Sequence, residues 1–138
     1  MFYKIYLNSA NKISGDVYNG TYKISLPNVQ NANGGKDWGI AVQSFHSSTI
    51  NDVPFTISTN IPLKNTYVGK EANNTLICLS SLNFHQQVTS SSCDCILANT
   101  IQLYQNASIE INIKSISQTE NVDLSDGWHM TLVIYNII

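Results

Sequence analysis

The chain has 138 residues and a net charge of -2, and its basic residues are seven lysines without a single arginine. This length is typical of one domain that buries its own core, so neither a metal nor a disulfide is needed for folding. The scattered lysines argue against direct nucleic-acid binding, which relies on clustered basic residues and arginine forks. No apolar run approaches the roughly 18 residues of a membrane-spanning helix, so we expect no membrane span.

The composition favours β-structure. Isoleucine leads the apolar residues, and asparagine, serine and threonine are abundant, whereas residues that favour helices are scarce. Branching at Cβ suits a pleated strand better than a helix. The composition therefore predicts an all-β fold.

Four strands are predicted in the first half of the chain. The first has Tyr3, Ile5 and Leu7 on one face, and the others cover 21–26, 38–45 and 55–61. In the third strand, we expect Trp38, Ile40, Val42 and Ser44 to share a face. Asn19–Gly20 is a hairpin-turn signal. Because Pro54 cannot lie within a central strand, the fourth strand is expected near a sheet edge.

The second half predicts four more strands, at 75–84, 99–105, 108–116 and 128–137. A helical face through Ile96, Leu97, Ile101 and Tyr104 is an alternative for the second of these. The strand at 108–116 has the clearest alternation, with its isoleucines on one face and polar residues on the other. In the last strand, the aligned apolar residues are Trp128, Met130, Leu132 and Ile134.

These patterns predict one domain over residues 1–138, with about eight strands in an antiparallel two-sheet sandwich. Long polar connections at 28–36, 46–52 and 85–94 suit Greek-key crossings, so a single jelly roll is the expected topology. A further polar loop is expected at 118–127.

The chain shows no catalytic motif, so we expect no enzyme activity, no catalytic residues and no cofactor. His46, His85 and His129 lie beside predicted strand ends or loops. Convergence of the three as in metal-binding cupin barrels is one alternative, but a structural role for each is favoured. Glu120, Asp123 and Asp126 have a spacing at which oxygen ligands could hold calcium, but the calcium-loop pattern is absent, so these residues are expected to be solvated. We therefore expect no bound metal.

Three other features leave alternatives open. Cys78, Cys93 and Cys95 are expected to be free thiols, with a disulfide or a zinc site as alternatives. The seven tyrosines are either strand formers or contact residues at interfaces and sugar-binding grooves. The glycosylation motifs at Asn19, Asn73 and Asn106 carry no weight, since the chain begins without a secretory signal and is expected to be made in the cytoplasm.

Segments 2–15 (FYKIYLNSANKISG) and 22–27 (YKISLP) resemble the start of small single jelly-roll proteins in the capsids of large icosahedral DNA viruses. The resemblance lies mainly in 2–27, with IAVQSF at 40–45 and the closing strand similar in rhythm. Lys12 stands where that group commonly has arginine, and the Cys93–Cys95 pair is not part of its motif.

The resemblance implies a structural capsid subunit of the virion, either the vertex (penton) protein or a minor capsid protein. Its partners would be other capsid proteins, and a homo-oligomer, such as a pentamer, is expected. The expected contact segments are 1–9, 135–138 and the loops 28–36 and 85–94. The alternative is a carbohydrate-binding jelly roll or fibre-tip domain, in which tyrosine, tryptophan and asparagine line a glycan groove. A cupin-like enzyme is a third class.

Overall fold

The computed structural model describes residues 2–24, 38–61, 67–68, 71–72, 75–79, 83–85, 107–117 and 119–136. Their elements in chain order are β1 (Phe2–Asn8), the 3₁₀ turn η1 (Ser9–Asn11), β2 (Ser14–Gly15), β3 (Asn19–Ile24), β4 (Trp38–His46), β5 (Phe55–Thr59), β6 (Tyr67–Val68), β7 (Glu71–Ala72), β8 (Thr75–Leu79), β9 (Asn83–His85), β10 (Ala107–Ser115) and β11 (His129–Asn136).

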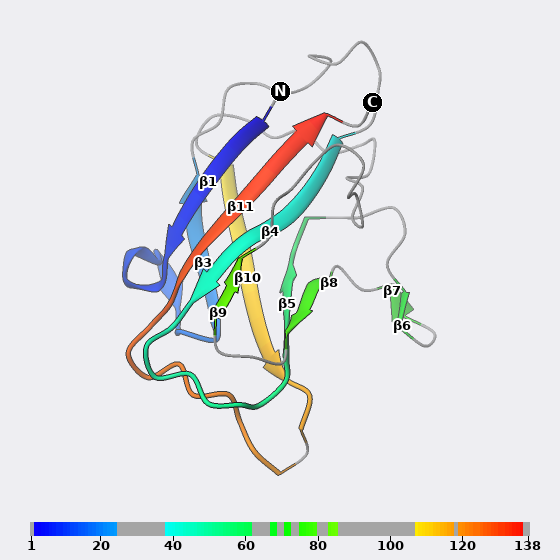
Figure 1. Cartoon of the computed structure of the whole chain (residues 1–138). Coiled ribbons are helices and arrows are strands. Elements are labelled where there is room, and N and C mark those ends of the chain that lie inside the picture. The colour runs from blue at the N-terminus through cyan, green and yellow to red at the C-terminus, as the bar shows by residue number, and fades with distance from the viewer. Residues whose placement is uncertain are drawn as a thin grey trace.

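The strands form two antiparallel sheets that face each other (Figure 1). One sheet has the order β1-β11-β4-β9 and the other has the order β2-β3-β10-β5-β8, while β6 and β7 form a separate small hairpin. Eight strands remain when the short β2, β6 and β7 are left out. Counted in chain order, the first of these pairs with the eighth, the second with the seventh, the third with the sixth and the fourth with the fifth. This nested pairing is that of a jelly roll, so the predicted fold is confirmed.

The core lies between the two sheets and follows the predicted alternation. In β10, Ile109, Ile111 and Ile113 are at most 4% exposed, while Glu110 and Lys114 are exposed. The predicted inward residues of the closing strand, Trp128, Met130, Leu132 and Ile134, are also buried. Both clear alternation patterns therefore identified the buried face correctly.

A β-bulge in β4 corrects the predicted face of that strand. Leu132 of β11 lies opposite Val42, but the preceding Thr131 lies opposite Ser44, so Gln43 is the extra residue. The bulge shifts the alternation by one position. Phe45 is therefore buried at 1% exposure, and Ser44, which was expected to share the face of Val42, lies on the opposite face.

The predicted strand at 75–84 is in fact two strands. β8 (Thr75–Leu79) pairs with β5 in one sheet, and β9 (Asn83–His85) pairs with β4 in the other. The chain thus crosses between the sheets at this point. A second irregularity places Leu76 as the extra residue opposite β5, so Leu76 and Leu79 are both buried.

The strand predicted after Pro54 lies near a sheet edge, as expected, because β5 is next to β8, the last strand of this sheet among the described residues. Pro54 precedes the strand, and its carbonyl accepts a hydrogen bond from Ile116 N at 2.9 Å. The expected hairpin turn at Asn19–Gly20 is wrong. Asn19–Gly20 lies within β3 rather than in the hairpin turn. The turn instead forms around Asp16, whose Oδ1 accepts hydrogen bonds from the backbone N–H groups of Tyr18 and Asn19 at 2.8 Å each.

The polar loop predicted at 118–127 also contributes to the core. Val122 and Leu124 are fully buried. Val122 is held on both sides, because its carbonyl accepts a hydrogen bond from Tyr18 Oη at 2.9 Å and its N–H donates to Ser115 Oγ at 2.8 Å. The expected segments 28–36, 86–94 and 99–105 and the terminal pair 137–138 lie outside the described residues.

Candidate functional site

The outer face of the β1-β11-β4 sheet carries an open hollow of about 350 Å³. Its lining residues are Tyr6, Leu7, Asn8, Asn11, Ser44, His46, His129, Met130 and Thr131. None of these nine residues is an aspartate, a glutamate, a lysine or an arginine. The hollow is therefore a hydrogen-bonding surface whose formal charge is limited to its two imidazoles.

Strand register explains how residues far apart in sequence meet in this hollow. Asn8 of β1 lies opposite His129 of β11, which in turn lies opposite His46 of β4. Residues two apart along a strand share a face, so a second row lies beside the first. That second row consists of Tyr6, Thr131 and Ser44.

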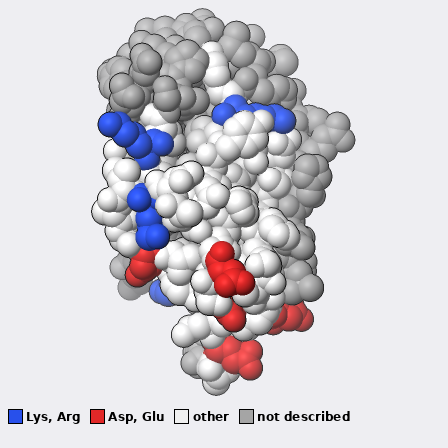
Figure 2. Space-filling model, turned by 90° about the vertical axis from the view of Figure 1, so that its left-hand side faces the viewer, with Lys and Arg blue, Asp and Glu red and all other residues white. Residues whose placement is uncertain are grey.

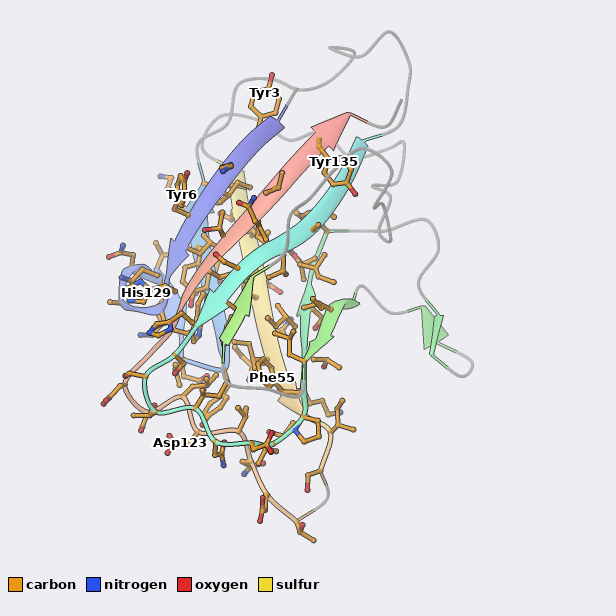
Figure 3. All side chains as sticks on the ribbon, viewed as in Figure 1. Tyr3, Tyr6, Phe55, Asp123, His129 and Tyr135 are labelled. Carbon is orange, nitrogen blue, oxygen red and sulfur yellow. The ribbon has the colours of Figure 1, made fainter. Side chains whose placement is uncertain are left out.

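Tyr6 provides the aromatic part of the hollow. Its side chain is 75% exposed and points away from the sandwich, whereas Phe55 lies between the sheets (Figure 3). Asn8 already uses its side-chain oxygen to accept a hydrogen bond from Ala10 N at 2.9 Å, which fixes the start of η1. The exposed tyrosine ring, the neighbouring amides and the hydroxyls suit a neutral polar ligand or a protein surface.

The same outer face is apolar toward the other end of β11. Val133 and Tyr135 are 1% exposed and pack with Ala41 as a cluster separate from the main core. Gly39 makes room for the tyrosine, since a Cβ at that position would lie 2.6 Å from the Tyr135 ring. The outer face of this sheet is thus divided between the polar hollow at one end and the buried apolar cluster at the other.

The three histidines lie on neighbouring strands of the same sheet. His46 and His129 are exposed and directly opposite each other, and His85 of β9 is opposite Ser44 in the backbone register. The two exposed histidines line the outer hollow, not the interior as in a cupin barrel. Among the described residues, no three His, Cys, Asp or Glu side chains group closely enough to hold a metal ion.

The acidic residues of the 118–127 loop are exposed, and the carboxylate of Asp123 stabilises the loop itself. Asp123 Oδ1 accepts a hydrogen bond from Ser125 N at 2.9 Å, which lowers the pKa of that carboxyl. Asn51 joins this loop to the β4–β5 connection by accepting from Asp123 N at 2.7 Å and donating to Asn121 O at 3.1 Å. In Figure 2, Asp and Glu side chains gather toward this lower end of the molecule.

Tyr22 is a buried titratable residue of the main core. Its side chain is 2% exposed, and its hydroxyl has no hydrogen-bond partner among the described residues. Burial, with a smaller contribution from the Asp16 charge, raises its pKa to about 12. Gly20 leaves the space that the hydroxyl occupies, since a Cβ there would lie 2.9 Å from Tyr22 Oη.

We expect Tyr22→Phe to raise the free energy of unfolding by about 1 kcal/mol at neutral pH, because it removes a buried hydroxyl that lacks a partner. The wild type should also lose stability between about pH 10, where the unfolded tyrosine ionises, and about pH 12, where the folded one does. The phenylalanine variant should lack this contribution. Urea denaturation at pH 7 and pH 11 measures both effects, and a loss above about 1 kcal/mol at pH 7 would show that the hydroxyl is bonded in solution.

β1 lies at the end of the four-stranded order, so one side of its backbone has no strand partner among the described residues. Lys4 is the one charged residue among its seven residues. An edge strand with so little charge is a template for pairing with another chain. This edge and the hollow are adjacent, because Tyr6 and Asn8 belong to both.

Cys78 belongs to β8, and Cys93 and Cys95 lie outside the described residues, so the expectation of free thiols stays a prediction. The described part of the chain contains no helix that is long and apolar enough to cross a membrane. Comparisons with protein-family models, with curated proteins and with solved structures gave no match to this chain.

Proposed function

We propose that the chain is a structural subunit of an icosahedral viral capsid, either a vertex (penton) protein or a minor capsid protein, and acts through protein–protein contacts. The observation that carries this proposal is the nested pairing of eight strands in two sheets. Viral capsid proteins share this architecture with lectin domains and cupins. The resemblance of residues 2–27 to small capsid proteins favours the first of these classes.

The surface of the first sheet supports a role in assembly. A neighbouring subunit can pair through main-chain hydrogen bonds with the side of β1 that has no strand partner within the described part of the chain, and side-chain contacts then determine which partner fits. Tyr6 offers a large exposed ring beside this edge. Uncharged hydrogen-bonding residues around it suit a hydrated interface of about 800 Å² per partner, the usual size of a stable contact.

The proposal predicts that the purified protein forms an oligomer, and a pentamer if it occupies a vertex. Tyr6→Lys should weaken this association at least about tenfold, because it places a charge where an aromatic contact was buried. The melting temperature should stay unchanged, since Tyr6 is 75% exposed in the single chain. Native mass spectrometry and light scattering over a concentration series measure the association.

Asn112→Lys is the matched control, because it adds the same charge on the outer face of the opposite sheet. Association should persist in that variant. A full-length protein that stays monomeric at high concentration and is absent from virus particles would contradict the proposal.

The hollow favours a second candidate, a glycan-binding module. Tyr6 provides a face for stacking on a sugar ring, and Asn11, Ser44 and Thr131 provide hydrogen-bonding groups without formal charge. A glycan array probed with the monomeric protein tests this reading. Binding that is lost in Tyr6→Ala would replace the capsid proposal only if the wild type also fails to assemble.

A further inference from the structure

The cross-strand pair His46 and His129 has a geometry that a metal ion can bridge. The two residues are direct register partners on adjacent antiparallel strands, so their side chains leave the sheet on the same face. Both are exposed, and both line the outer hollow. This arrangement follows from strand pairing and does not depend on the function proposed above.

The spacing of such a pair matches what two imidazole ligands require. Directly opposed residues in an antiparallel sheet have Cβ atoms about 4.5–5.5 Å apart. Imidazole nitrogens bind zinc at about 2.0–2.1 Å, so one ion fits between two rings that extend from the sheet side by side. The rigid β4–β11 pairing, with eight register partners, holds the two ligands together before the ion arrives.

The donor set selects the class of ion. The hollow has no carboxylate, and hard cations such as calcium and magnesium are bound mainly by carboxylate and carbonyl oxygens. Neutral imidazole instead suits zinc, copper and nickel. We propose that His46 and His129 form a surface site for a divalent transition-metal ion, whose remaining positions are taken by water or by a group from outside this chain.

The neighbours of the pair are suited to the same role. Thr131 and Ser44 follow the two histidines on the same face, in the next row of the hollow. A metal-bound imidazole is usually oriented by a group that accepts a hydrogen bond from its other ring N–H, directly or through water, and a hydroxyl is able to do this. His129 is also adjacent to η1 in Figure 3, at the end of the hollow formed by Asn11.

The test uses full-length, untagged protein that has been freed of metal with a chelator and dialysed. Titration with Ni²⁺ alone at pH 7.5, followed by calorimetry, should show one site per chain. In ¹H–¹⁵N spectra, the paramagnetic ion should broaden the amides around His46 and His129 first. This mapping separates the histidine site from any binding to the three cysteines.

His46→Asn and His129→Asn should each lower the Ni²⁺ affinity at least about tenfold, since each removes one of two protein ligands. Both side chains are exposed, so the variants are expected to fold, and their spectra without metal check this. Asn11→Ala is the control, because it changes the lining of the hollow without removing an imidazole and should bind as the wild type does. Unchanged affinity in either histidine variant, or first broadening away from β4 and β11, would overturn the proposal.

Discussion

Replacing Trp128 by alanine is expected to lower the free energy of unfolding by about 3–5 kcal/mol. The side chain is 1% exposed and packs against Tyr22 and Phe45, with ring centroids 5.5 and 5.9 Å away. Its Nε1 also donates a hydrogen bond to Val17 O at 2.8 Å. The substitution therefore leaves a large cavity and a carbonyl without its donor.

Chemical denaturation in urea measures this loss through the shift of the midpoint at constant slope. Trp128→Phe is the matched variant, because it keeps an aromatic ring in the core but removes the indole N–H. Its loss should be clearly smaller than that of alanine. A loss below about 1 kcal/mol for Trp128→Ala would mean that this end of the sandwich is loosely packed in solution.

Ile111→Ala is expected to cost about 2–5 kcal/mol, the range for truncating a fully buried isoleucine. Ile111 is 1% exposed in the centre of β10, which pairs with β3 on one side and with β5 on the other. The surrounding strands cannot collapse into the space without breaking their register.

Asn112→Ala on the opposite face of the same strand serves as the control and should change the stability by no more than about 0.5 kcal/mol. The two substituted residues are neighbours in the same strand, so comparing the two variants separates the effect of burial from the effect of strand propensity. A loss below about 1 kcal/mol for Ile111→Ala would mean that the assigned inward face of β10 is wrong.

Strands with strict alternation could be predicted from the sequence because one face is buried and the other is not. This is why the isoleucines of β10 were placed correctly. The inward residues of β11 were also identified correctly, although Val133 and Tyr135 on its outer face are buried as well. The loop after β10 was predicted as polar because Val122 and Leu124 are surrounded by polar residues and separated by Asp123, although both are fully buried. Burial there depends on Tyr18 and Ser115, which are brought to the loop by the fold.

Bulges and crossings could not be read from the sequence. Gln43 looks like any other strand residue, and its extra position is revealed only by the partner strand, in which Thr131 and Leu132 pair with Ser44 and Val42. The crossing between β8 and β9 is hidden because Ser80–Ser81–Leu82 does not interrupt the apolar run with a glycine or proline. Gly20 was read as a turn residue, but its lack of a side chain makes room for Tyr22.

The outer hollow was missed for the same reason. Its residues come from η1 and from three strands, two of which are distant in the chain from the first, and each strand contributes only two ordinary polar side chains. The histidine pair forms because β4 and β11 are register partners, which no local pattern encodes. The sequence shows only isolated histidines near strand ends. The strand pairing shows that two of them lie directly opposite each other.

The nested strand pairing also determines when this protein can fold during its synthesis. Phe2 pairs with Tyr135 and Asn8 with His129, so β1 has to wait for the last strand to leave the ribosome. In the other sheet, β3 likewise waits for β10. The chain loses conformational entropy when such long loops close, and this loss comes before the strands make stabilising contacts. Folding is therefore slow, as in other β-sandwiches. Until then the nascent chain carries unpaired strands that can associate with other chains, and the innermost pair, β5 with β8, is the first of the four nested pairs that can form.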